Sequence, residues 1–180
     1  MLKRKKSRNQ SCKDGIITLQ PKIQSAMPNT FSKLYIHHVS AVKYRQALIL
    51  PSFEEELYKY IVGIIKNLGQ TPLQVNGMPD HIHIAARLRP DMAPATFVQK
   101  VKANSSKWIN DQGFLPQRFN WQTGGGTFSV SRTHVDALRH YIKNQKAHHA
   151  KKSFRKEYLD ILKQNQIEPD PAYLPDFFED

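Results

Sequence analysis

The stretch that decides the fold is Met78-Pro79-Asp80-His81-Ile82-His83-Ile84, in which a turn leads into alternating histidine and isoleucine. On a β-strand successive side chains point to opposite faces, so His81 and His83 share one face while Ile82 and Ile84 point into the core. Two imidazoles on one face can bind a single divalent metal as neutral ligands. Two histidines also fall at this spacing by chance on a half-exposed strand, so the pair alone does not establish a metal site.

A second informative stretch is Tyr141-Ile142-Lys143-Asn144-Gln145, which lies within a segment of helical periodicity. At about 100° per residue, Tyr141, Gln145 and His148 occupy one narrow arc of the helix surface, beside an apolar arc. Packing of the apolar arc on a sheet would leave the Tyr141 arc half buried at the edge of the contact. The sequence does not show whether the strand of His81 and His83 is the surface that this helix faces.

Turn signals and periodicity divide the rest of the chain into short strands and longer helices. A strand at 71–78 pairs with the histidine strand at 81–88, and a second hairpin is predicted over 119–131, around Gly124-Gly125-Gly126. Helices are predicted at 52–68, 94–112 and 153–166, in addition to the one that carries Tyr141. This order predicts an α+β fold, an antiparallel sheet with helices packed on one face.

The charge is strongly positive and uneven, with a net charge of +12. Residues 1–30 hold seven Lys/Arg and one acidic residue, half of the excess, and lack periodic apolar residues. We therefore expect a flexible basic arm at 1–26, a single domain at 27–166, and an extended acidic tail at 167–180. Whether the arm binds a polyanion or only adds solubility stays open at this point.

Other features of the composition place the protein among soluble cytoplasmic proteins. The single cysteine, Cys12, excludes a disulfide framework and fits a reducing compartment. No apolar run approaches the roughly 18–20 residues of a membrane span, and Gly15-Ile16-Ile17-Thr18-Leu19 is too short for a signal-peptide core. A polyanionic partner is expected from the charge.

Taken together, the motifs resemble the HUH endonuclease superfamily, and more narrowly the single-tyrosine transposases of small bacterial insertion sequences and their repeat-associated relatives. The resemblance runs from about Met27 to Tyr173. Besides the two stretches above, the matching pieces are Leu34-Tyr35-Ile36-His37-His38-Val39, Trp121-Gln122-x-Gly124, Phe128-Ser129-Val130-Ser131 and His148-His149-x(4)-Phe154-x-x-Glu157. One departure is Gly125, where the family usually carries an aromatic residue between two glycines.

The resemblance implies a ferredoxin-like HUH endonuclease fold and a DNA transposase. Tyr141 would attack a phosphate of single-stranded DNA beside a hairpin and leave a covalent 5′-phosphotyrosine. His81, His83 and Gln145 would hold Mg²⁺ or Mn²⁺, and the protein would work as a homodimer on the nucleoid. No general base stands out in the sequence; His148, on the same arc, is a candidate.

Basic residues on two predicted helices and between them would follow the DNA backbone. They are Lys100, Lys107, Lys143, Lys146, Lys151, Lys152 and Arg155. The lysines of the 94–112 helix fit a solvated helix face equally well.

Two other functions compete with the transposase. A domesticated, non-transposing hairpin-binding or nicking protein would have the same fold, and an RNA-binding module would need an aromatic-rich strand motif that the sequence lacks.

Overall fold

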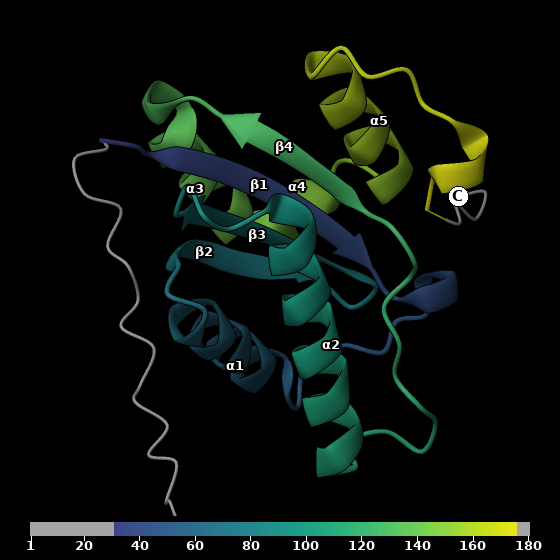
Figure 1. Ribbon diagram of the computed structural model, residues 1–180. Helices are drawn as coiled ribbons and strands as arrows, with labels where there is room; N and C mark the ends of the chain where they lie inside the picture. Colours follow the sequence, from purple (N-terminus) through teal and green to yellow (C-terminus); the bar gives the residue numbers. More distant parts are fainter. Residues whose placement is uncertain (1–30, 176–180) are drawn as a thin grey trace, which may run out of the picture. The chain divides into compact units, whose positions relative to one another are not determined.

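The computed structural model describes residues 31–175, and the predicted arm at 1–26 and the last part of the acidic tail lie outside this range. The described chain forms one antiparallel sheet with the strand order β2-β3-β1-β4 (Figure 1). Its strands are β1 (Leu34–Ala41), β2 (Thr71–Met78), β3 (His81–Leu88) and β4 (Gly126–Val130). The predicted α+β class and the 71–88 hairpin are therefore confirmed.

Within residues 31–175, five α-helices surround this sheet, and they cover both of its faces. They are α1 (Glu54–Asn67), α2 (Pro94–Gln112), α3 (Val135–Lys143), α4 (Gln145–His149) and α5 (Phe154–Gln164). Helices α1 and α2 close the larger hydrophobic core on one face, and α5 closes a smaller one on the other (Figure 1). The expectation that all helices pack on one face was wrong, because β1 and β3 are buried on both sides and need a cover on each.

The alternation of β3 places each side chain as the sequence predicted. Ile82 and Ile84 belong to the core under α1 and α2. His81 and His83 lie on the opposite face, paired across β1 with Ala41 and Val39, and Val39 belongs to the core under α5. The histidine face therefore meets α3, α4 and α5 rather than solvent.

The second predicted hairpin does not form. Residues 126–130 pair with β1 as β4, but Trp121 makes a single bridge to Val42 instead of pairing with β4. The backbone N–H of Gln122 donates to the carbonyl of Ala41 over 2.9 Å. Gly124 and Gly125 have φ of 85° and 128°, so the chain between the two segments makes a wider loop than a tight hairpin turn.

Candidate active site

The two histidines of β3 are almost completely buried, with exposed fractions of 1% and 0%. His81 Nδ1 lies 2.7 Å from Asp80 Oδ1, and Arg45 holds the same carboxylate over 2.8 Å. Burial tends to raise the pKa of Asp80, but His81 and Arg45 together lower it to about 2, so the carboxylate is ionised and only accepts. His81 therefore carries its proton on Nδ1, and its Nε2 is unprotonated.

His83 has a comparable partner on β1. His83 Nδ1 lies 3.0 Å from His37 Nε2, and the two rings stack with centroids 5.2 Å apart. Burial, with help from the neighbouring His83 and His38 imidazoles, lowers the pKa of His37 to about 3, so this ring is neutral. His37 is thus a structural histidine that orients His83.

Tyr141 and Gln145 do not share one continuous helix, which corrects the sequence prediction. Helix α3 ends at Lys143 and α4 begins at Gln145. The side-chain amide of Asn76, on β2, donates to the carbonyls of Ile142 and Lys143 over 3.0 and 2.9 Å. These two carbonyls therefore accept hydrogen bonds from a side chain of β2 instead of from backbone N–H groups of a further helical turn, and α3 ends there.

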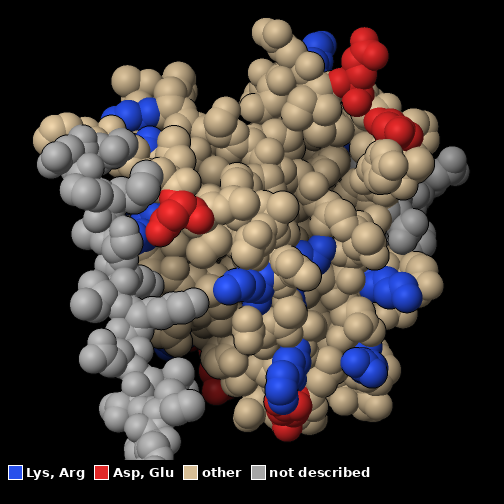
Figure 2. Space-filling view, in the orientation of Figure 1, with Lys and Arg blue, Asp and Glu red and all other residues tan. Residues whose placement is uncertain are grey.

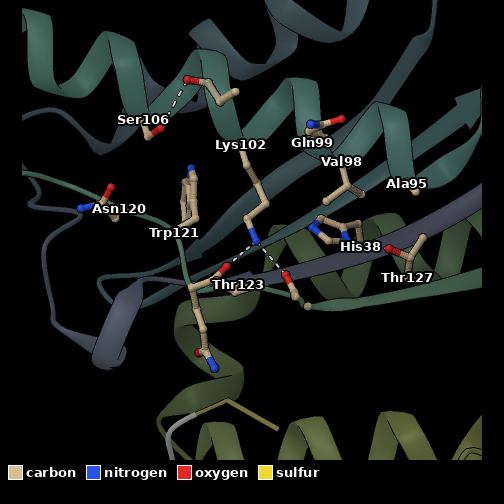
Figure 3. Close-up of a pocket in the computed structure, with 14 residues that line it drawn as sticks. His38, Ala95, Val98, Gln99, Lys102, Ser106, Asn120, Trp121, Thr123 and Thr127 are labelled. Carbon is tan, nitrogen blue, oxygen red and sulfur yellow. Dashed lines mark hydrogen bonds between the residues drawn. The ribbon is translucent and has the colours of Figure 1, made fainter. Parts of the chain in front are cut away.

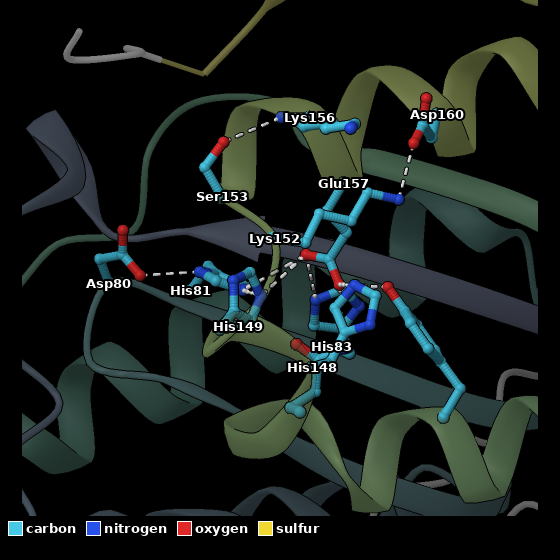
Figure 4. Close-up of polar contacts among 12 residues, drawn as sticks. Asp80, His81, His83, His148, His149, Lys152, Ser153, Lys156, Glu157 and Asp160 are labelled. Atoms are coloured by element: carbon cyan, nitrogen blue, oxygen red, sulfur yellow. Dashed lines mark hydrogen bonds and ion pairs between the residues drawn. The ribbon is translucent and has the colours of Figure 1, made fainter. Parts of the chain in front are cut away.

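The two side chains nevertheless converge on a single carboxylate. It belongs to Glu157 on α5, which points toward His83, His148 and His149 (Figure 4). The Tyr141 hydroxyl donates to Glu157 Oε1, and Gln145 Nε2 donates to the same oxygen over 3.0 Å. Sequence reasoning included Glu157 in a matching motif but gave it no role. It lies on the buried face of α5 with Phe154 and Tyr158, and a carboxylate on the apolar face of a helix is the signal that could have identified it.

His149, the last residue of α4, completes the group. His149 Nε2 lies 3.1 Å from His81 Nε2 and 3.0 Å from Glu157 Oε2. His83 Nε2 lies 3.4 Å from the same Glu157 oxygen. One donor atom from each of His81, His83, His149 and Glu157 therefore falls within 4.8 Å of the others, so the group can hold a metal ion.

Four buried side-chain atoms at this site complete no well-formed hydrogen bond within residues 31–175, although the Glu157 oxygen among them lies 3.0 Å from His149 Nε2. They are His83 Nε2, Gln145 Oε1, His148 Nε2 and Glu157 Oε2. Buried polar atoms are normally satisfied, and several unpaired ones at a single point are the pattern expected of an ion-binding or catalytic site. The residues present therefore fit a divalent cation among His81, His83 and Glu157.

The electrostatics of the site keep Tyr141 protonated and Glu157 ionised. Burial and the adjacent Glu157 carboxylate raise the pKa of the Tyr141 phenol well above its usual range. Burial acts to raise the pKa of Glu157, but His149, His83 and the Tyr141 hydroxyl hold it far below its usual range. The predicted candidate base, His148, is half-exposed on α4 with its Nε2 3.4 Å from Glu157 Oε1; the hydroxyl of Tyr141 bonds to Glu157 instead.

Tyr141 and Glu157 line a cavity of about 750 Å³ between α3 and α5. A second cavity of about 570 Å³ lies on the opposite face of the sheet, between α2 and the glycine loop (Figure 3). There the Lys102 ammonium donates to the carbonyls of Gln122 and Gly124. The tyrosine cavity reaches the reactive groups, so it is the candidate entrance for a substrate.

The predicted DNA-binding residues are divided between the two faces of the sheet. Lys100 and Lys107 lie on α2, away from Tyr141, and the basic side chains on that side form separate spots with acidic ones among them (Figure 2). Three of the predicted residues form ion pairs, Lys107 with Asp111, Lys146 with Glu54 and Lys152 with Asp160. Lys143 and Lys151 are exposed near α4 and make no ion pair within the described part of the chain, and Arg155 is exposed on α5.

No helix among the described residues is long and apolar enough to cross a membrane. No curated protein matches the chain. Among solved structures, a candidate transposase from Deinococcus radiodurans has the same fold, with a TM-score of 0.53, 22% identity, and coverage of 64% of this chain and 93% of that one. A tyrosine transposase associated with REP sequences, solved bound to a REP hairpin, superimposes with a TM-score of 0.49 at 14% identity over 68% of this chain and 71% of its own.

A match between the sequence and a family model shows which family the chain belongs to. The model of the IS200-like transposases matches residues 30–145, well over half of the chain. This segment contains β3 with its paired histidines and α3 with its tyrosine, and it ends at Gln145. The chain belongs to the IS200-like transposase family.

Proposed function

We propose that this transposase cleaves and rejoins single-stranded DNA at hairpin-flanked ends, with Tyr141 as the nucleophile. One observation carries the proposal: the Tyr141 hydroxyl and the nitrogens of His81 and His83 face the same carboxylate, that of Glu157. A phosphate in the adjoining cavity would meet the nucleophile and the paired histidines together. Family membership supports the reaction class.

In the proposed reaction, the oxygen of Tyr141 attacks phosphorus and the bond to the 3′-oxygen breaks. The phenol loses its proton, and the 3′-oxygen takes one up to become a free hydroxyl. The covalent 5′-phosphotyrosine keeps the energy of the broken bond, so a 3′-hydroxyl can later attack it and rejoin the strand without ATP. His81 and His83, with Gln145 as the expected third ligand, would hold Mg²⁺ or Mn²⁺, which supplies positive charge to the phosphate oxygens.

The chain's own residues prepare the nucleophile. The hydrogen bond from Tyr141 to Glu157 fixes the phenol in one orientation, and burial excludes competing water from most of the ring. Asn76 fixes the end of α3, which carries Tyr141, to β2 beside the strand of the two histidines. These contacts hold the attacking oxygen on the side of the sheet that the histidines face.

We also propose the setting of the reaction. The substrate would be hairpin DNA in the cytoplasm, at the nucleoid, and the net charge of +12 supports a polyanionic partner. Lys143, Lys146, Lys151, Lys152 and Arg155 would contact phosphates near the site, and Lys100 and Lys107 a more distant part of the strand. The arm at 1–26 would add affinity without specificity, the domain would end near residue 166, and two chains would act as a homodimer.

The test is the capture of the covalent adduct. The full chain is incubated with Mn²⁺ and hairpin-containing single-stranded DNA, digested with protease, and the peptide that carries DNA is identified by mass spectrometry. We expect the adduct on Tyr141 in the native protein and none in Tyr141→Phe, which keeps the ring but lacks the attacking oxygen. Tyr173→Phe is the matched control, because Tyr173 is 78% exposed and should not affect the adduct. An adduct on another tyrosine would refute the proposal, and hairpin binding without any adduct would favour the domesticated binding protein.

A further inference from the structure

We infer that Tyr44 and Lys43 form a binding site for one unpaired nucleotide of the DNA strand, with its base stacked on the Tyr44 ring. The inference rests on the proposed function, because it concerns the same single-stranded substrate. It adds a contact outside the tyrosine cavity and outside the basic residues named so far. Both residues belong to the short turn Lys43–Arg45, which follows β1 (Figure 1).

The backbone of this turn is strained. Tyr44 has φ 57° and ψ 24°, and Arg45 has φ 47°. Within residues 31–175, Gln166 is the only other non-glycine residue with a positive φ. The left-handed conformation is unfavourable for a residue with a bulky side chain. Strain of this kind persists where surrounding contacts impose it, and it is concentrated at functional sites.

Arg45 accounts for the inward side of the turn. Its Nε and Nη2 donate to Asp80 Oδ2 over 3.0 and 2.8 Å, and Asp80 Oδ1 lies 2.7 Å from His81 Nδ1. The backbone N–H of Val42 also donates to the Asp80 carbonyl, over 2.8 Å. These contacts hold the turn against the residue that orients His81, so the position of Tyr44 relative to the histidine strand is fixed.

The outward side of the turn presents an aromatic ring beside a positive charge. Tyr44 is 57% exposed, and the Lys43 ammonium lies 4.9 Å from the centroid of its ring. A nucleotide consists of a flat base and a charged phosphate joined through the sugar. A ring and an ammonium group side by side therefore match both of its parts.

The surroundings favour a nucleotide over a protein partner. The exposed residues beside Tyr44 in the chain are Lys43, Gln46 and Ala47, which do not form the apolar core of a protein interface. The net charge of +12 attracts a polyanion. A single aromatic ring with a nearby cation is a pattern by which proteins hold single strands, since every base has a flat face that can stack.

The turn lies within reach of a strand bound in the tyrosine cavity. Ala41, three residues before Tyr44, pairs directly with His81 across the sheet. Three residues span at most about 11 Å and paired Cα atoms lie roughly 5 Å apart, so Tyr44 is within about 16 Å of His81. The Arg45 guanidinium lies 5.1 Å from the centroid of the Phe154 ring, at the start of α5. A strand that passes the basic residues around the start of α5 therefore comes next to Tyr44.

The experiment measures the binding of hairpin DNA with a single-stranded extension to the full chain, by fluorescence anisotropy in EDTA at several salt concentrations. Tyr44→Gly removes the ring and should weaken binding about tenfold, as the loss of one base stack does, without changing the salt dependence. Lys43→Ala should instead reduce the slope of log K against log salt by about 0.7, the value for one phosphate contact on a single strand. Tyr173→Ala is the matched control, because it removes a ring that is 78% exposed and should change neither quantity.

Thermal melting shows whether the Tyr44 ring has a structural role. Glycine relieves the strain at φ 57°, so the melting temperature of Tyr44→Gly should equal or exceed that of the native protein. Tyr44→Trp keeps an aromatic face and should bind DNA within about twofold of the native affinity. Native DNA affinity in Tyr44→Gly, or a melting temperature lower by several degrees, would overturn the inference.

Photochemical cross-linking identifies the contact directly. Iodouracil placed at successive positions of the extension should cross-link to Tyr44 from one position, and cross-links to other residues alone would also overturn the inference. A Tyr141 adduct together with native DNA affinity in Tyr44→Gly would refute only this contact. The expected loss of affinity in Tyr44→Gly, with no adduct from the native protein, would refute only the cleavage chemistry. A changed oligomeric state with native DNA affinity would assign the ring to a protein partner and refute the inference.

Discussion

The buried His38 provides a quantitative test of how the sheet is packed. Its ring is 2% exposed on the face that carries α2, with Nδ1 2.8 Å from Thr127 Oγ1 and Nε2 2.5 Å from Ser40 Oγ. A neutral ring satisfies both hydroxyls, one as donor and one as acceptor. Burial, reinforced by the positive charge of Lys102, lowers the pKa of His38 from 6.5 to about 3.

The sign and size of the effect on stability follow by linkage. Because the folded pKa is depressed, the unfolded chain binds this proton more readily between pH 6.5 and pH 3. The free energy of unfolding is therefore unaffected by His38 above pH 6.5 and falls as the pH is lowered toward 3. At pH 5 the unfolded side chain is almost fully protonated and the folded one is neutral, which costs about 2 kcal/mol relative to pH 7.

Urea unfolding at pH 7 and pH 5, in the presence of EDTA, measures this contribution of His38 to the free energy of unfolding. The other histidines contribute equally to native and variant proteins, so we compare the loss of stability between the two pH values. His38→Gln should lose about 2 kcal/mol less than the native protein, whereas His134→Gln, at an exposed position, should match it. An equal loss in His38→Gln would refute the reasoning, as would a native His38 ring that becomes protonated between pH 7 and pH 5 by NMR.

Three further predictions concern the scaffold of the site. Ile84→Ala empties part of the core under α1 and α2, where Ile84 is 0% exposed, and should lower the free energy of unfolding in urea by about 2–5 kcal/mol; a loss below 1 kcal/mol would show that this face is loosely packed. Gly125→Ala requires a Cβ at φ 128° and 2.6 Å from the Val39 carbonyl oxygen, so its melting temperature should fall by several degrees, whereas an unchanged value would contradict the described loop. Asn76→Ala leaves the last two carbonyls of α3 without their donor and should cost about 1–3 kcal/mol in the same urea assay, with less Tyr141 adduct; normal adduct yield would mean that this contact does not position the nucleophile.

The sequence predicted the elements whose pattern is local. The histidine strand follows from strict alternation over 81–84, and its pairing with 71–78 follows from the short turn at Pro79-Asp80. The order of helices and strands around it was sufficient to indicate the α+β class. The number of faces covered by helices was not predictable in the same way, because it depends on how the sheet as a whole is buried.

The errors occur where distant segments decide the structure. Helix α3 ends before Asn144 because the side-chain amide of Asn76 donates a hydrogen bond to the carbonyl of Lys143. Asn76 is far away in the sequence, so helical periodicity could not predict this contact. The failed hairpin at 119–131 has a similar cause, since Trp121 finds its partner at Val42. The role of Glu157 is not predictable from its local sequence, because it depends on three imidazoles contributed by β3 and α4.

The four donor atoms come from residues that are far apart in the sequence, so an ion bound to all of them would connect distant parts of the chain. Residues 81 and 83 lie in the sheet, while 149 and 157 belong to the two short C-terminal helices. An ion held by all four would act as a reversible cross-link that closes a loop of roughly 70 residues and removes conformational freedom from the unfolded chain, as a disulfide does. Loss of the ion would then remove a cross-link between β3 and the helices α4 and α5.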